Sequence, residues 1–240
     1  MSVLMKRTIG EIAAANPDAE RLFEILGIDY SCHGNLSLRE ACGAVGLDPE
    51  KVHRSIDQLP RGAEVNWLEQ PVSKLLEHLR DDSHPALGSA IRAAAAALAV
   101  DCAICSSYPH KVARLRVAFG ALADRLRPHM SREDHILFPL IEHLDGCWTR
   151  AEHPTIQLAG GVGGAVQTLI LDHGAMIAHL DEVNDVMEEI IEQPMPCRQL
   201  IESLRALDHE LREHIHLENN VLFPRALALD AAAVPEHAMG

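Results

Sequence analysis

The sequence predicts an all-α protein, in which a small N-terminal helical domain is followed by a four-helix bundle. From about Trp67 onward, apolar residues recur with a helical period, and no stretch alternates for long enough to indicate a strand. Breaks rich in proline or glycine divide this region into four long segments, near residues 72–100, 110–143, 163–192 and 197–226. Such a pattern is typical of an antiparallel bundle, which we place at residues 67–228.

Residues 1–60 are predicted to form short helices, because helix-start signals recur in them. Asn16-Pro17 and Asp48-Pro49 each place a capping residue before a proline at the first helical position. Ser37 and Glu40 have the spacing of a capping box, in which each side chain accepts a hydrogen bond from the other's free backbone N–H. These signals indicate a separate helical domain ahead of the bundle.

Charge and composition exclude several classes of partner. The chain of 240 residues has a net charge of −14, which argues against nucleic acid and against docking on anionic lipid. Its longest strictly apolar run, residues 93–100, is far shorter than the ~20 residues of a membrane span. Lys6 and Arg7 are not followed by the apolar core of a secretory signal. We therefore expect a cytoplasmic protein whose six cysteines are reduced.

A repeated motif stands out among the fifteen histidines. Residues 129–139 and 214–224 both read His-x-x-x-Glu-x-x-(Ile/Val)-Leu-Phe-Pro. The spacing of four residues places each histidine and its glutamate one turn apart on the same helix face. The motif His-Glu-x-x-His of zinc peptidases is absent, because the histidines of residues 209–214 are one residue too far apart.

Both motifs interrupt the apolar face of their helices. At ~100° per residue, several apolar residues fall within about 40° of each motif histidine. They are Leu115, Leu122, Ile136 and Leu140 for His129, and Leu200, Leu207 and Val221 for His214. A buried carboxylate without compensation is costly, and metal cations would supply that compensation.

Each motif helix is preceded by a helix with one histidine on its apolar face, His84 in the first half and His173 in the second. Each half thus offers three donor groups, which predicts two metal ions at the centre of the bundle. The six candidate ligands are His84, His129, Glu133, His173, His214 and Glu218. Imidazoles and carboxylates suit iron or manganese better than structural zinc. Two glutamates could bridge the ions and leave positions open for a small ligand.

The chain resembles the iron–sulfur cluster repair di-iron proteins, the RIC family of YtfE and ScdA proteins, over nearly its whole length. The loop Asp29-Tyr30-Ser31-Cys32-His33-Gly34 is similar to the family's Asp-Tyr-Cys-Cys-Gly-Gly, and the run from His214 to Leu227 is the most specific match. The resemblance implies an ScdA-type domain at residues 1–60 and a haemerythrin-like bundle. It also implies two non-haem iron ions per chain, held by the six candidate residues.

The implied function is recovery from nitric oxide or peroxide stress in the cytoplasm, with iron supplied to damaged iron–sulfur proteins. This is the role of an iron donor rather than of a turnover enzyme. Two alternatives share the same bundle: a haemerythrin-like protein that binds or scavenges nitric oxide or dioxygen, and a di-iron reductase of nitric oxide or peroxide. A homodimer is compatible with the resemblance, although no sequence pattern establishes one.

The chain departs from the family's pattern at two places. A further histidine ligand of the family falls on Cys105. Three alternatives are open: Cys105 is itself a ligand, His110 takes the place of the missing histidine, or one iron keeps an additional open position. Ser31 replaces the first of the paired loop cysteines. Cys32 alone cannot form the local disulfide, and any mechanism that needs both thiols is in doubt.

Overall fold

The computed structural model describes residues 7–60, 65–100, 107–150, 152, 161–191 and 197–233. Within these ranges every regular element is helical, and the only extended pairing is an isolated bridge between Thr8 and Ser37. The predicted all-α class is therefore confirmed. By their contacts, the residues fall into two compact units, one of residues 1–76, 144–155 and 212–240 and one of residues 77–143 and 156–211.

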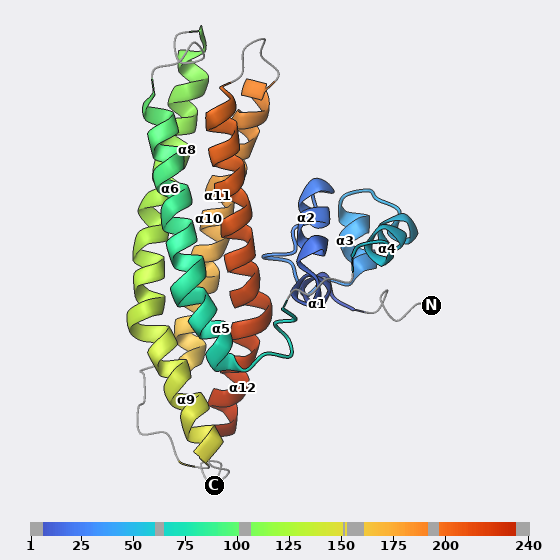
Figure 1. Ribbon diagram of the computed structural model, residues 1–240, viewed down its shortest axis with the longest axis vertical. Helices are drawn as coiled ribbons and strands as arrows, with labels where there is room; N and C mark the ends of the chain where they lie inside the picture. The colour runs from blue at the N-terminus through green and yellow to red at the C-terminus, as the bar shows by residue number, and fades with distance from the viewer. Residues whose placement is uncertain are drawn as a thin grey trace. The chain divides into compact units, whose positions relative to one another are not determined.

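The second unit contains long helices that lie side by side (Figure 1). They are α6 (His84–Ala99), α8 (Pro109–Arg132), α10 (Gly161–Ile191) and most of α11 (Arg198–Leu217). Helix α8 packs against α10 and also contacts α6. All four lie in the segments that the sequence predicts as the bundle.

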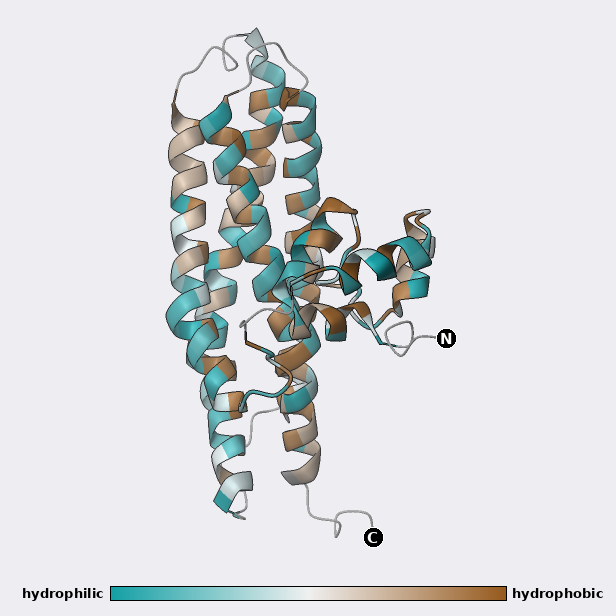
Figure 2. Ribbon diagram, turned by 45° about the vertical axis from the view of Figure 1, so that its right-hand side comes forward, coloured by the Kyte–Doolittle hydropathy of each residue, from teal (hydrophilic) through white to brown (hydrophobic). Residues whose placement is uncertain are grey.

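The apolar stripe of α10 shows how these helices form a core. Val166, Leu169, His173, Met176 and Leu180 are buried at intervals of three and four residues, as expected for one face of a helix. Figure 2 shows the corresponding alternation of brown and teal residues along the long helices. A histidine therefore occupies a position on this stripe that packing alone would give to an apolar residue.

The first unit contains the short N-terminal helices. These are α1 (Ile9–Ala15), α2 (Pro17–Ile25), α3 (Leu38–Ala44) and α4 (Pro49–Asp57). The side chains of Asn16, Ser37 and Asp48 accept hydrogen bonds at the starts of α2, α3 and α4, as predicted. The core of these helices includes the fully buried Phe23 and Leu38. The same unit includes η4 (Glu218–Leu222) and α12 (Phe223–Ala233), and η4 contacts α1.

Three π-helical turns interrupt the long helices in the described part of the chain. They are η2 (Leu79–Ser83), which joins α5 (Val72–His78) to α6, η3 (Glu133–Leu137), which joins α8 to α9 (Phe138–Arg150), and η4, which joins α11 to α12. A proline follows each turn at the second position of the next helix: Pro85, Pro139 and Pro224. Proline lacks an N–H and its ring crowds the carbonyl four residues earlier, so a wider turn before it relieves the conflict.

The π-turn at η3 overturns one detail of the predicted core. A regular helix would place Ile136 on the same face as His129, but the side chain of Ile136 is 46% exposed. A π-turn closes its hydrogen bond over five residues, so the residues within it are displaced around the helix axis. Leu137 and Phe138 are buried after it instead.

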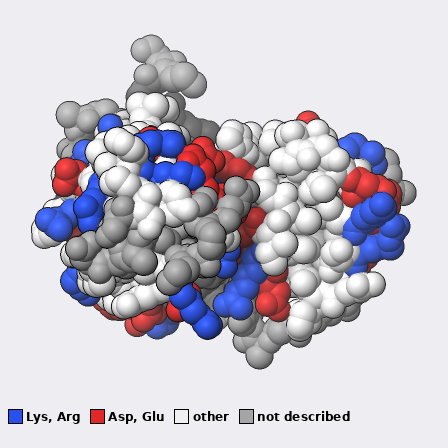
Figure 3. Space-filling model, turned by 90° about the horizontal axis from the view of Figure 1, so that it is seen from above, with Lys and Arg blue, Asp and Glu red and all other residues white. Residues whose placement is uncertain are grey.

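Charged side chains of both signs are intermixed on the face shown in Figure 3. No described helix combines the length and the apolar character that crossing a membrane requires.

Candidate metal centre

The six predicted metal-binding side chains are all buried. His129, Glu133, His173, His214 and Glu218 have no exposed surface, and His84 is 8% exposed. Each residue comes from one of the long helices or from a π-turn between them. Because these are polar or charged groups on helix faces that otherwise carry apolar residues, their burial needs a physical reason.

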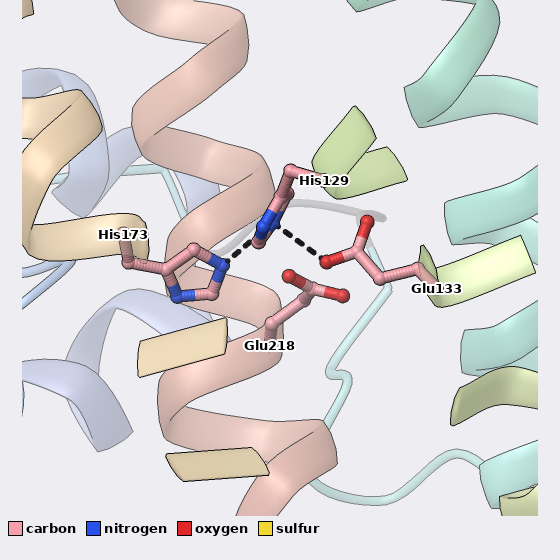
Figure 4. A group of neighbouring side chains, drawn as sticks. All are labelled: His129, Glu133, His173 and Glu218. Carbon is pink, nitrogen blue, oxygen red and sulfur yellow. Dashed lines mark hydrogen bonds and ion pairs between the residues drawn. The ribbon is translucent and has the colours of Figure 1, made fainter. Parts of the chain in front are cut away.

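The potential ligand atoms of these residues form two groups. One consists of His129, Glu133, His173 and Glu218, which lie close together in Figure 4, and the other of His84, Glu133 and His214. Within each group, one ligand atom from every residue lies within 4.8 Å of the others. All six predicted residues are therefore present, and Glu133 belongs to both groups.

The two oxygens of Glu133 approach different histidines. Its Oε1 lies 2.7 Å from Nε2 of His129, and its Oε2 lies 3.2 Å from Nε2 of His84. One carboxylate thus faces a histidine of each group. Glu133 could therefore offer a ligand oxygen to a cation held by either group.

The histidine nitrogens of the first group fit the coordination of a single ion. Nε2 of His129 and Nε2 of His173 lie 3.0 Å apart, and the two rings meet edge to face. Two nitrogens this close together could both bind the same ion, since metal–nitrogen bonds are about 2.1 Å long. In the second copy of the motif, Nε2 of His214 lies 3.3 Å from Oε2 of Glu218.

Carboxylates also lie behind two of the histidines. Nδ1 of His84 is 3.0 Å from Oδ1 of Asp134, and Nδ1 of His129 is 3.9 Å from Oδ2 of Asp172. Asp172 in turn pairs with Arg132 and Arg125. Only the contact of His84 with Asp134 is within hydrogen-bond distance. Histidines that bind metals commonly donate their second ring N–H to such a group, which fixes the ring and makes the ligand nitrogen more basic.

The π-turns and these carboxylates were not predicted from the sequence. Glu133 and Glu218 are the first residues of η3 and η4, and the N–H of Phe138 and of Phe223 donates back to their carbonyls. His84 follows directly after η2. The proline at the second position of the helix after each turn is a sequence signal that could have indicated these turns. The pairing of Asp172 with arginines of α8 could not be found in this way, because it depends on packing between helices.

Of the alternatives for a further ligand, the structure excludes His110. This residue is exposed and lies 19 residues before His129 on the continuous helix α8 (129 − 110). At 1.5 Å per residue, the two histidines are about 28 Å apart. Cys105 lies outside the described residues.

The loop of residues 29–34 is ordered around one carboxylate. Oδ1 of Asp29 accepts hydrogen bonds from the N–H and hydroxyl of Ser31 and from the N–H of Cys32. Burial would raise the pKa of Asp29, but these bonds and the neighbouring His33 outweigh it and hold the pKa below its usual value. Cys32 belongs to neither of the two groups of potential ligands.

Two family models match the chain, one in each of the regions that the sequence analysis distinguishes. Residues 86–226 match the hemerythrin HHE cation binding domain, and residues 5–60 match ScdA_N, a domain of unknown function (DUF542). The chain is 27% identical over 228 residues to the iron-sulfur cluster repair protein YtfE of Salmonella schwarzengrund (strain CVM19633). It is 26% identical over 227 residues to the YtfE proteins of Yersinia pestis (strain Pestoides F) and Yersinia pseudotuberculosis serotype O:1b. Each match covers 92% of this chain and 96% of the relative. Because the match to the hemerythrin model spans more than half of the sequence, the chain belongs to the hemerythrin HHE cation binding domain family.

Proposed function

We propose that the chain holds two iron ions and supplies iron for the repair of damaged iron–sulfur clusters. The proposed ligands are His84, His129, Glu133, His173, His214 and Glu218. The observation that carries the proposal is the position of Glu133, whose two oxygens face histidines of two different groups. A site for one ion would have no need of a carboxylate shared in this way.

The donor set favours iron over structural zinc. Both groups offer imidazole nitrogens and carboxylate oxygens, and neither contains a cysteine. Such donors suit iron, whereas structural zinc is usually enclosed by four ligands that include thiolates. The two glutamates bring negative charge into a buried site, and bound cations would offset it. When bound, the iron would supply redox chemistry and positions for exchangeable ligands.

The role in repair rests on the relatives that are named iron-sulfur cluster repair proteins. The similarity extends through both the N-terminal region and the bundle. We retain residues 1–60 and 67–228 as the two domains of this proposal. Its expected targets are iron–sulfur proteins damaged by nitrosative or oxidative stress in the cytoplasm, with the chain acting as an iron donor.

A second candidate function is the capture of nitric oxide or dioxygen. It is favoured by a difference between the two groups, since His84, Glu133 and His214 offer three donors and the other group offers four. An ion held by fewer protein ligands keeps more positions for a small molecule. Capture requires reversible binding with the iron retained, whereas donation requires the iron to leave.

The first test is the metal content of protein purified without oxygen or chelator, followed by incubation with a nitric-oxide-damaged iron–sulfur enzyme. We expect about two irons per chain and recovery of the enzyme's activity as the iron leaves the chain. Glu133→Gln should abolish both results. His110→Gln is the matched control, because this exposed histidine lies at the far end of α8 and should be dispensable.

The outcomes separate the two functions. Loss of iron in step with enzyme recovery supports donation. A stable adduct with nitric oxide that retains its iron, without recovery of the enzyme, supports capture. Wild-type protein that contains no iron after reconstitution would contradict both.

A further inference from the structure

The π-turn η4 makes direct contacts with the N-terminal region inside one compact unit. Nδ2 of Asn219 donates to the carbonyl of Ser31 at 3.1 Å. Nδ2 of Asn220 donates to the carbonyl of Tyr30 at 3.0 Å and lies 3.3 Å from that of Ser31. Both asparagines follow Glu218 within the same five-residue turn. The loop of residues 29–34 is therefore bonded to the turn that carries a proposed metal ligand.

Two glycines leave space for the side chain of Asn220. A methyl group added at Gly34 would lie 2.0 Å from Oδ1 of Asn220, and one added at Gly10 would lie 2.8 Å from its Cγ. Real Cβ atoms do not come so close to another atom. The carboxamide of Asn220 thus occupies a cradle that exists only because both positions lack a side chain.

The same carboxamide is oriented by a buried histidine. Nδ2 of Asn220 lies 2.9 Å from Nδ1 of His216, whose ring packs edge to face on Tyr30. Nδ2 of Asn220 carries only hydrogens to donate, so Nδ1 of the fully buried His216 accepts one of them. One amide hydrogen is directed to His216 and the other to the loop carbonyls, which fixes the orientation of the carboxamide.

We propose that Asn220 is a positioning residue, which couples the loop of residues 29–34 to the metal-bearing turn η4 and thereby slows metal release. This inference rests on the proposed function, because it assigns the control of iron release to the contact between the loop of residues 29–34 and η4. While Asn220 is seated between Gly10 and Gly34, the turn that begins at Glu218 is held in place. When the loop separates from the turn, η4 loses these bonds, and Glu218 is freer to leave the metal.

The test compares four variants with the wild type. Asn220→Ala removes the carboxamide, and Gly34→Ala places a methyl group where Oδ1 of Asn220 lies. The double variant Gly34→Ala/Asn220→Ala removes both the bonds and the collision, because the three nearest atoms to a methyl at Gly34 all belong to the carboxamide of Asn220. Gly43→Ala is the matched control, since a methyl group there meets nothing within 4 Å.

Two readouts are needed. Amide hydrogen exchange of residues 29–36 in metal-free protein reports the loop contact alone, and transfer of iron from loaded protein to a colorimetric ferrous chelator reports release. We expect Asn220→Ala and Gly34→Ala each to accelerate both processes about tenfold. Gly43→Ala should match the wild type. The double variant should match Asn220→Ala rather than multiply the two effects, because the collision needs the carboxamide.

Each other outcome contradicts a definite part of the inference. Wild-type exchange and release in Asn220→Ala would overturn it entirely. Faster exchange with unchanged release would overturn the coupling to the metal. A double variant in which the two effects multiply would mean that Gly34 acts independently of Asn220. Protein that binds no iron would contradict the proposed function, while the exchange measurement would still decide whether Asn220 holds the loop.

Discussion

The two copies of the repeated motif have the same local structure and different surroundings. In both, a histidine is followed four residues later by a glutamate that begins a π-turn, and a Phe-Pro pair follows that turn. At matching positions, however, Ile136 of η3 is 46% exposed and Val221 of η4 is 1% exposed. The difference lies outside the motif, because η4 contacts the N-terminal helix α1.

The residues between glutamate and leucine follow the same division. In η3, Asp134 pairs with His84, and His135 is exposed with Nδ1 close to the carbonyl of Ser131. In η4, the corresponding Asn219 and Asn220 bond to the carbonyls of the 29–34 loop. The motif therefore specifies the turn and its glutamate, while the variable residues within it specify what the turn contacts. These contacts are the ring of His84 in one copy and the backbone of the 29–34 loop in the other.

The largest expected effect separates the two glutamates. Glu133 belongs to both groups of potential ligands and Glu218 to one. Glu133→Gln should therefore reduce bound iron from about two per chain to nearly none, whereas Glu218→Gln should leave about one. Elemental analysis of anaerobically purified variants measures this. Equal losses in the two variants would show that the copies are equivalent at the metal.

The carboxylate behind His84 should have the next largest effect. Asp134→Asn replaces the acceptor at Nδ1 of His84 with an amide, and loss of such a partner typically weakens metal binding tenfold to a hundredfold. Competition with a chelator of known affinity gives the change. Glu142→Gln is the control, because this exposed carboxylate pairs with Arg80 instead of a predicted ligand. Equal affinities in the two variants would rule out the role of Asp134.

The difference in cover predicts a difference in stability between matched truncations. Val221→Ala should lower the free energy of unfolding by about 2 kcal/mol, because it removes buried methyl groups. Ile136→Ala, at the corresponding position, should cost about 0.5 kcal/mol. Urea denaturation of both metal-free variants measures the two values. A cost at Ile136 as large as that at Val221 would mean that η3 is covered in solution.

Much of this arrangement could be predicted from sequence, because helical periodicity, caps and a repeated motif are local signals. They predicted the long helices and placed the six polar residues on the faces that are buried. The exposure of Ile136 could not be predicted from a regular period of 3.6, because the π-turn displaces it. Partners such as Asp134 for His84 and the Tyr30 carbonyl for Asn220 were also missed, since they depend on how distant segments pack.

An effect about half as large as that of Val221→Ala is expected in the loop that contacts η4. Asp29→Asn should destabilise the protein by about 1 kcal/mol at neutral pH, because it weakens the acceptor for the N–H groups of Ser31 and Cys32. The folded pKa of Asp29 is below its ordinary value of 3.8, since these hydrogen bonds outweigh burial. The stabilisation of the folded state by the Asp29 carboxylate is therefore fully present above pH 3.8, and it is lost as the pH falls through the lower, folded pKa. Urea denaturation across this range should show the gap between wild type and variant closing toward low pH. A gap that stays constant with pH would mean that the Asp29 charge does not hold the loop, and that η4 is covered by a segment whose order comes from Asn219 and Asn220 alone.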